Sequence, residues 1–348
     1  MGLKNSLDKR TLFFRRSLRQ KGLKPVNSRK VLVSQFAGLG DAALLAPYVK
    51  GLINQGYGAD ICTTPSLKPF WEYFIPEADI LTFDQSLGFG RELEELGNEI
   101  ASRDYEAAFS VSISSLSTYI AGSARTPERY GMTEDGKLYT GLKQLMEFWY
   151  DAYPDEHIKL RYQKLFSKKI KDIKPAYPAI EKKEKIFKLA IHPGAKWIPR
   201  RWPQEHFIAL ARILDGHNLK TAILFGPQEE EWHEAFSKEK FSENIQLINT
   251  AGMKEMFEII LSSELFLGND SGPAHAASLA GMKTIVLWGP GNYERVRPIG
   301  DNVHILMKEI SCRPCRQYIH EYKCELGDNI CLKQIYPEEV MELIKRYV

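Results

Sequence analysis

Short apolar runs alternate with segments of helical periodicity along most of the chain, and this pattern restarts once. Apolar runs of strand length begin at Lys30, Ala59, Asp79 and Tyr105, and then at Phe187, Lys220, Ile245, Leu265 and Lys283. Amphipathic helices are predicted between and after them, at about 41–54, 65–74, 91–104, 203–216, 229–238, 254–264, 272–281 and 337–348. Alternating strands and helices indicate βαβ units and a parallel sheet. Right-handed crossovers make each run a doubly wound α/β domain.

The chain is long enough for two such domains. It has 348 residues, whereas a single hydrophobic core rarely grows past about 250–300. A Lys-rich stretch with two prolines separates the two runs. We predict a basic amphipathic N-terminal extension (1–29), an N-terminal Rossmann-like domain (30–170), a linker (171–185), a C-terminal Rossmann-like domain (186–335) that includes a group of cysteines, and a C-terminal helix (336–348). This organisation predicts a central cleft, with ligands at the carboxyl ends of the strands.

The net charge of +3 conceals a basic N-terminus on a mildly acidic body. Residues 1–30 contain ten Lys and Arg and one Asp, whereas the rest of the chain carries a net charge of −6. Leu3, Leu7, Phe14 and Leu18 recur at helical spacing between these cations. The pattern is typical either of a helix that lies on an anionic membrane surface, here residues 1–28, or of a solvated tail. The acidic body disfavours nucleic acid as a partner.

Neither a membrane span nor a signal peptide is indicated by the hydropathy of the chain. No apolar run approaches the ~20 residues of a transmembrane helix. Arg15 and Arg16 also interrupt the short apolar stretch at 12–14. We therefore expect a cytoplasmic protein, peripheral at the inner face of the inner membrane where its basic segment binds lipid.

The first candidate for chemistry is the turn Gly38-Leu-Gly-Asp41, which follows the strand that begins at Lys30. Gly38 and Gly40 permit a tight turn in which the backbone approaches a ligand closely. Asp41 is either the N-cap of the next helix or a base at the edge of the cleft, and the two roles are compatible. The glycine spacing does not match the full dinucleotide fingerprint, which disfavours an NAD enzyme.

The second candidate is the segment Gly268-Asn-Asp-Ser-Gly-Pro-Ala-His275, which joins a strand to a helix. Backbone N–H groups at such a helix start can face a phosphate, and the Ser271 hydroxyl adds a donor. Gly272 lets the backbone approach the ligand, and Pro273 suits the first helical turn. The alternative is an ordinary turn with Asp270 or Ser271 as cap.

Two further turns supply charge after predicted strands. Lys196, Arg200 and Arg201 lie in His192-Pro-Gly-Ala-Lys-Trp-Ile-Pro-Arg-Arg-Trp-Pro203, and they are either phosphate-binding cations or part of a solvated basic loop. Glu229 lies in Gly226-Pro-Gln-Glu-Glu-Glu231. A carboxylate there can bind ribose hydroxyls, or it can simply occupy the first turn of a helix.

Three of these segments resemble glycosyltransferase family 9, whose best-known members are the ADP-heptose:lipopolysaccharide heptosyltransferases. They are residues 30–47, 192–203 and 268–277, in the family's order. The resemblance implies a GT-B fold and inverting transfer from a nucleotide-diphosphate sugar. Residues 30–170 would then form the acceptor domain, and residues 186–335 the nucleotide-sugar donor domain. It further implies ADP-heptose as donor and a lipid-linked lipopolysaccharide inner-core glycan as acceptor.

The resemblance also implies roles for individual residues. Asp41 would be the general base, and Arg200 would neutralise the departing diphosphate. The expected donor-binding set is Gly40, Lys196, Arg201, Glu229, Asp270, Ser271, Gly272, Pro273 and His275. Because cations and a helix N-terminus can stabilise a diphosphate by themselves, we expect no cofactor for catalysis. A nucleotide-sugar epimerase of the same fold, or another GT-B enzyme with a different donor, is the alternative.

Four of the five cysteines cluster near the C-terminal end of the chain. They are Cys312, Cys315, Cys324 and Cys331, with the spacing C-x2-C-x8-C-x6-C. Four thiolates match the ligand count of a structural Zn or Fe site. Disulfides or free thiols remain the alternatives, although a reducing compartment disfavours disulfides.

Overall fold

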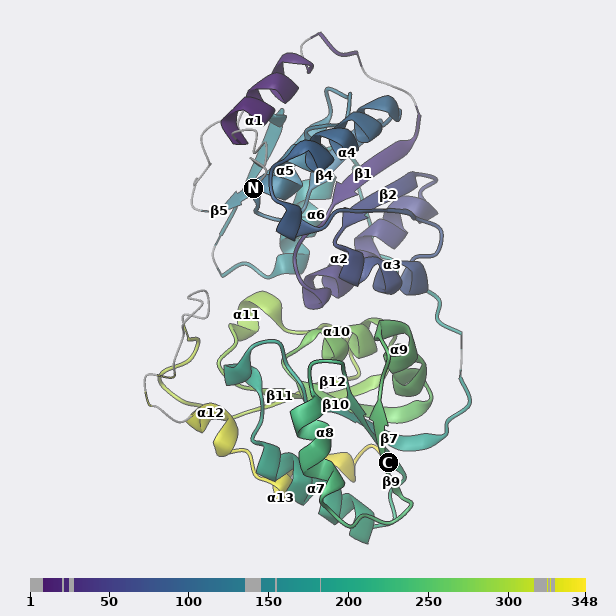
Figure 1. Ribbon diagram of the computed structural model, residues 1–348, viewed down its shortest axis with the longest axis vertical. Helices are drawn as coiled ribbons and strands as arrows, with labels where there is room; N and C mark the ends of the chain where they lie inside the picture. Colours follow the sequence, from purple (N-terminus) through teal and green to yellow (C-terminus); the bar gives the residue numbers. More distant parts are fainter. Residues whose placement is uncertain are drawn as a thin grey trace, which may run out of the picture. The chain divides into compact units, whose positions relative to one another are not determined.

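The computed structural model describes residues 9–20, 22–24, 28–134, 145–153, 155–181, 183–315, 324, 326 and 329–348. By its internal contacts the chain divides into two compact units, 1–178 and 179–348. Each unit holds one parallel six-stranded sheet covered by helices (Figure 1). The predicted pair of doubly wound α/β domains, a GT-B fold, is confirmed.

The sheet of unit 1 has the order β3-β2-β1-β4-β5-β6. Its strands are β1 (Lys30–Ser34), β2 (Gly58–Thr63), β3 (Asp79–Thr82), β4 (Ala107–Ser110), β5 (Arg129–Glu134) and β6 (Phe148–Ala152). Its helices are α1 (Lys9–Leu18), α2 (Leu39–Asn54), α3 (Lys68–Phe74), α4 (Arg91–Ser102), α5 (Ser115–Ala121) and α6 (Ile158–Ser167). The central strand β4 is buried along its whole length, as expected of a parallel strand with both faces covered.

The sheet of unit 2 has the order β12-β11-β10-β7-β8-β9. Its strands are β7 (Phe187–His192), β8 (Thr221–Phe225), β9 (Ile245–Asn249), β10 (Ser263–Asn269), β11 (Lys283–Trp288) and β12 (Val303–Met307). Its helices are α7 (Gln204–Gly216), α8 (Glu230–Ser237), α9 (Met253–Leu261), α10 (Gly272–Leu279), α11 (Tyr293–Val296), α12 (Ile330–Lys333) and α13 (Pro337–Ile344). When the strands of unit 2 are numbered from β7 as the first, their order across the sheet is the same Rossmann order as in unit 1.

In each sheet the direction of winding reverses between the first and the fourth strand. This switch point lies between β1 and β4 in unit 1 and between β7 and β10 in unit 2. Loops that leave the two strands diverge there, so the carboxyl ends of these pairs are the favoured ligand sites. The turns that begin at Gly38, Pro193 and Asp270 leave the carboxyl ends of β1, β7 and β10.

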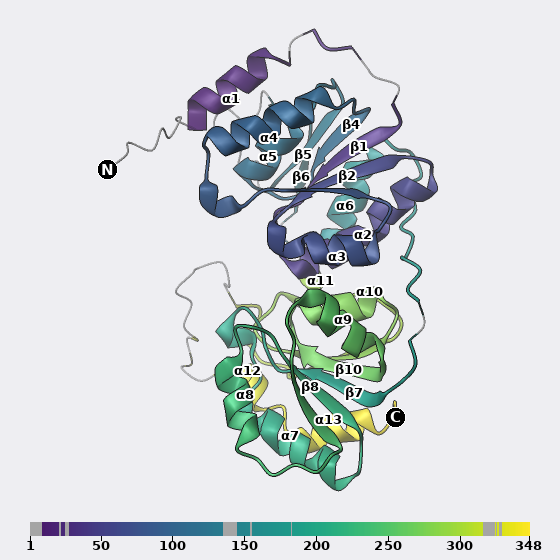
Figure 2. The ribbon, with the colours of Figure 1, turned by 45° about the vertical axis from the view of Figure 1, so that its right-hand side comes forward.

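Helix α1 is part of unit 1 and lies along α4 and α5 in both ribbon views (Figures 1 and 2). Leu12 and Phe13 are 1% and 4% exposed and join the apolar cluster of this unit. The Phe13 ring lies 5.5 Å from that of Tyr119 on α5, edge to face. Phe14 and Leu18 lie on the other side and are exposed. Leu3 and Leu7 of the predicted amphipathic stripe lie outside the described residues.

The structure corrects the prediction that Asp41 caps a helix. Helix α2 begins at Leu39 with Gly38 as N-cap, so Asp41 lies in the first helical turn and Gly40 directly before it. The Asp41 carboxylate is therefore not needed for capping. The predicted pattern has no strand or helix between β4 and the linker, where the structure has α5, β5, β6 and α6. It also lacks α11, β12 and α12 in unit 2.

Candidate functional site

The turns after β7 and β10 lie side by side at the switch point of unit 2, where Gly268 pairs with His192 across the sheet. The buried side chain of Asn269 joins them. Its Nδ2 donates to the Pro193 carbonyl at 2.7 Å, and its Oδ1 accepts from the Trp202 N–H at 2.9 Å. One amide thus fixes both ends of the basic turn relative to the turn that holds Asp270.

Asp270 carries a buried carboxylate that faces the guanidinium of Arg200. Its exposed fraction is 1%, and Arg200 Nη1 lies 3.2 Å from its Oδ2. Burial raises the pKa of Asp270 to about 6, although the charge of Arg200 opposes that rise. A Cβ on Gly291 would lie 2.3 Å from Oδ2 and 2.9 Å from the Trp288 ring, so glycine is required there.

Helix α10 begins next to this pair. Ser271 is its N-cap residue, but its side chain makes no capping bond, and its buried Oγ has no hydrogen-bond partner within the described residues. Gly272 and Pro273 are the first two helical residues, as the sequence predicts. The first-turn N–H groups of a helix lack intrahelical acceptors and carry partial positive charge. A free hydroxyl and a helix N-terminus beside an Arg form an arrangement suited to an anion.

Glu229 lies on the other side of β7 and is held by the protein itself. Its Oε2 accepts from the Gly226 N–H at 2.8 Å and lies 3.2 Å from His192 Nε2. Burial works against ionisation, but these two partners and Arg201 together lower the pKa of Glu229. A Cβ on Gly194 would lie 1.3 Å from Oε1. The carboxylate is thus ionised and positions two turns, a role that sequence reasoning missed.

The structure separates the remaining residues of the basic turn. Arg201 donates from Nε to the Ala195 carbonyl at 2.8 Å and lies over the Trp232 ring, so it stabilises the turn itself. Lys196 is exposed, and His275 is buried within α10. Only Arg200, among the three predicted cations, is paired with Asp270.

In unit 1, Asp41 is half-buried in the first turn of α2. Its charge contributes, after burial, to raising the pKa of Tyr162 on α6 well above the usual value, so the two groups lie close together. The preceding turn is fixed by Ser112, whose Oγ accepts from the Phe36 N–H at 3.0 Å. Gln85 also donates to the Phe36 carbonyl at 3.0 Å. These contacts position Asp41 on a rigid turn.

The four late cysteines are free thiols in the structure, as is Cys62. Burial, together with the charges of Cys315, Cys324 and Cys312, raises the pKa of Cys331 to about 11, so the thiols lie near one another. No three or more His, Cys, Asp or Glu side chains within the described ranges are arranged to hold a metal ion. The Cys315 N–H donates to the Pro290 carbonyl at 3.1 Å, next to Gly291.

Two Rossmann-like units, with a basic turn and a helix N-terminus at the switch point of the second, are the arrangement found in GT-B glycosyltransferases. A model of glycosyltransferase family 9 (heptosyltransferase) matches residues 93–325, more than half of the chain. The chain therefore belongs to glycosyltransferase family 9. Lipooligosaccharide heptosyltransferase 2 of Campylobacter jejuni subsp. jejuni serotype O:6 (strain 81116 / NCTC 11828) is 26% identical over 330 residues, covering 91% of this chain and 98% of the relative.

Solved structures show the same fold. The family 9 glycosyltransferase of Veillonella parvula DSM 2008 superposes with a TM-score of 0.77 at 18% identity and covers 94% of this chain and 99% of its own. E. coli heptosyltransferase WaaC with ADP superposes with a TM-score of 0.72 at 14% identity and covers 92% of this chain and 100% of its own. The iron-containing dodecameric glycosyltransferase TibC of enterotoxigenic E. coli H10407 superposes with a TM-score of 0.58 at 11% identity. It covers 93% of this chain and 77% of its own. The protein is thus a glycosyltransferase, as the resemblance implies.

Proposed function

We propose that this enzyme transfers heptose from ADP-heptose to an inner-core acceptor of lipopolysaccharide or lipooligosaccharide, with inversion at the anomeric carbon. The family description, the name of the Campylobacter relative and the ADP bound to WaaC support this choice. The observation that carries the donor side is the buried Asp270–Arg200 pair at the start of α10, beside the Ser271 hydroxyl, which has no hydrogen-bond partner among the described residues.

Asp41 is the general base in this proposal. The acceptor hydroxyl gives its proton to the carboxylate as its oxygen bonds to the anomeric carbon, and the bond from that carbon to the diphosphate oxygen breaks. ADP leaves with the electron pair. A half-buried carboxylate on a rigid turn suits this role because it keeps one orientation and stays accessible to the acceptor.

The test of the base is the Asp41→Asn variant, assayed for heptose transfer and for ADP binding. Loss of general-base catalysis lowers turnover by about 10²–10⁴-fold, while calorimetric ADP affinity stays the same. Asp79→Asn, which removes an exposed carboxylate of the same unit, is the control and retains activity. Transfer by the Asp41 variant at the wild-type rate rules out this role.

Arg200 and the N-terminus of α10 hold the diphosphate in this proposal, and the charge that develops on the leaving phosphate strengthens both interactions. The Arg200→Gln variant therefore binds ADP at least about tenfold more weakly and also loses turnover. Arg212→Gln removes an exposed arginine of unit 2 and serves as the control. Equal ADP affinity in both variants contradicts the assignment. No divalent metal is needed for leaving-group stabilisation here.

In this proposal the diphosphate is surrounded by further residues of the donor-binding set, namely Lys196, Gly272, Pro273 and His275. Gly40 belongs to the turn before Asp41. Arg201 and Glu229 are assigned a positioning role, because each already bonds to its own turn. A direct ribose contact from Glu229 would require its carboxylate to add a hydroxyl partner to the bonds it makes to Gly226 and His192.

We also propose that the enzyme acts at an anionic membrane surface, where a lipid-linked acceptor lies. None of the helices in the described part of the chain combines the length and apolar character that crossing a bilayer requires. Phe14 and Leu18 are 60% and 49% exposed on α1, beside the exposed Arg15. The Phe14→Ser and Leu18→Ser substitutions should reduce flotation with anionic vesicles while sparing transfer to a soluble acceptor. Unchanged flotation rules out this surface.

Finally, we propose that Cys312, Cys315, Cys324 and Cys331 hold a structural Zn or Fe ion. Four neighbouring thiols are a suitable donor set for either metal. The cluster connects to the donor turn through the Cys315–Pro290 hydrogen bond, so a bound metal would rigidify the loop beside Asp270. Elemental analysis of the purified protein should find about one metal ion per chain, and none in the Cys315→Ser/Cys324→Ser variant. A metal-free wild type refutes the site.

A further inference from the structure

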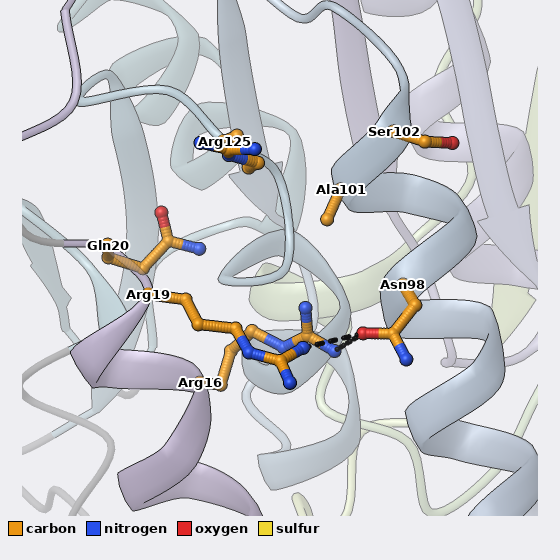
Figure 3. A pocket seen from close by; sticks show the side chains of 7 residues that line it. All are labelled: Arg16, Arg19, Gln20, Asn98, Ala101, Ser102 and Arg125. Atoms are coloured by element: carbon orange, nitrogen blue, oxygen red, sulfur yellow. Dashed lines mark hydrogen bonds between the residues drawn. The ribbon is translucent and has the colours of Figure 1, made fainter.

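A second site of unusual charge lies in unit 1, between the end of α1, the last turns of α4 and the loop that follows α5 (Figure 3). It is a cavity of roughly 470 Å³, which is within the range of small-ligand sites. Its polar lining comes from Arg16, Arg19, Gln20, Asn98, Ser102 and Arg125. Helix α4 ends and β5 begins at the amino end of the sheet, so this cavity lies opposite the edge that carries Asp41. The proposed glycosyl transfer makes no use of it.

The cavity concentrates positive charge that no carboxylate within the described residues neutralises. Arg16 Nη2 and Arg19 Nη1 both donate to the same acceptor, Asn98 Oδ1, at 3.2 and 2.8 Å. Figure 3 shows the two side chains reaching from α1 towards Asn98, with Arg125 on the adjacent loop. None of these three arginines forms an ion pair with a carboxylate in the described part of the chain. Like charges repel, so their convergence is unfavourable until an anion binds.

Arg16 is the most informative of the three because it is 2% exposed. A buried cation without a counter-charge is costly, and a long side chain ordinarily extends its charged end to water. Here the guanidinium is instead held in place by the Tyr119 hydroxyl at 3.3 Å and by that ring at 5.5 Å. Gly97 on α4 leaves space for this guanidinium, because a Cβ on Gly97 would lie 2.5 Å from Arg16 Nη2.

The amide side of the cavity is also fixed by the fold. Gln20 Nε2 donates to the Gly122 carbonyl at 2.7 Å, and its Oε1 accepts from Arg129 at 3.3 Å. Asn98 is fixed by the two arginines it accepts from. The lining is therefore organised before any ligand arrives, which reduces the entropy lost on binding.

We propose that this cavity binds a phosphate monoester, with the guanidinium groups of Arg16, Arg19 and Arg125 as its ligands. Guanidinium forks match phosphate oxygens in pairs, and a doubly charged monoester offsets more of the local charge than a carboxylate can. The cavity exceeds the size of a bare phosphate, so an organic group attached to the phosphate also fits. A lipid headgroup and a soluble phosphorylated metabolite share this chemistry.

The test measures binding directly and needs no transfer assay. The soluble probe is glycerol 3-phosphate, titrated by calorimetry into the full-length protein. The lipid probe is flotation with vesicles of phosphatidylcholine containing phosphatidic acid, compared with vesicles of phosphatidylcholine alone. Arg19→Gln and Arg125→Gln are the test variants because both residues are exposed, so their replacement spares the fold. Arg91→Gln removes the same charge from an exposed position on α4, outside both the cavity and α1, and is the matched control.

We expect Arg19→Gln and Arg125→Gln to bind glycerol 3-phosphate, or the phosphatidic-acid vesicles, at least about tenfold more weakly than the wild type does, whereas Arg91→Gln changes the affinity by less than about threefold. Loss of glycerol 3-phosphate binding alone identifies a soluble ligand, and loss of phosphatidic-acid flotation identifies a lipid headgroup. The proposal is overturned if the wild type binds neither probe. It is equally overturned if Arg91→Gln loses as much affinity as the two cavity variants, because that outcome reports only the general charge of the surface.

Discussion

The Asp270→Asn substitution should remove a pH-dependent loss of stability that the buried carboxylate imposes on unit 2. In the folded state the pKa of Asp270 is raised from 3.8 to about 6, with burial as the cause and Arg200 as a partial compensation. Between these two values the native state binds more protons than the unfolded state. Stability therefore falls as the pH rises through this window, and the loss is complete above pH ~6. Asn, which is neutral and nearly isosteric, has no such dependence.

The size of the effect follows from the shift in pKa. A difference of about two pKa units between the folded and unfolded states corresponds to about 3 kcal/mol once the group is ionised in both states. At pH ~4.5 about 1 kcal/mol of this cost is already present. The unfolding free energy of Asp270→Asn should therefore gain about 2 kcal/mol over that of the wild type between pH ~4.5 and ~7.5.

Urea unfolding of both proteins at these two pH values, followed by tryptophan fluorescence, measures the difference. Trp202 and Trp288 are fully buried in unit 2 and report on its unfolding. Asp301→Asn removes an exposed carboxylate of the same unit and controls for the change in net charge. If the difference between Asp270→Asn and the wild type is the same at both pH values, Asp270 is not a buried carboxylate of raised pKa and the electrostatic account of this turn is wrong.

Two further predictions concern packing. Gly194→Ala places a Cβ 1.3 Å from Glu229 Oε1 and should displace that carboxylate, which weakens ADP binding about tenfold, whereas Gly252→Ala, which meets nothing within 4 Å, should leave calorimetric affinity unchanged. Phe13→Ala should cost unit 1 about 3–5 kcal/mol in denaturant unfolding, whereas the exposed Phe14→Ala should cost less than about 0.5 kcal/mol. Equal costs for the two phenylalanines would show that α1 does not pack on unit 1.

Most of the fold could be predicted from the sequence because parallel strands that are buried on both faces appear as uninterrupted apolar runs. Strand β4 is of this kind, and the pattern locates it well. Strand β6 was not predicted because it lies at the sheet edge, where Phe148 and Asp151 are both exposed, so its apolar and polar residues form a mixed pattern. Strand β12 has the sequence Val-His-Ile-Leu-Met, a short apolar run interrupted by His304, and it was not predicted although the apolar signal is present.

The candidate site was harder to predict because its residues act through contacts between loops. The motif around Asp270 could be found from its glycine and proline content, but the role of Asn269 depends on its bonds to a turn 76 residues earlier in the chain. Glycine is likewise needed at position 291 because the Asp270 carboxylate and the Trp288 ring occupy the space that a side chain would take. For Arg200 and Arg201, neighbours in the sequence, only the structure shows that one pairs with Asp270 and the other with its own turn.

The two binding sites proposed for unit 1 lie at opposite ends of its sheet. Asp41 lies beyond the carboxyl edge of the sheet, whereas the arginine cavity lies at its amino edge. A phosphate in that cavity therefore does not compete for space with an acceptor at Asp41. Helix α1 supplies Arg16 and Arg19 to the cavity while Leu12 and Phe13 anchor it to the core. Deleting the N-terminal segment would therefore remove packing as well as charge. Point substitutions on the exposed side of α1 separate the two, which is why they, and not truncation, decide whether this segment binds a membrane.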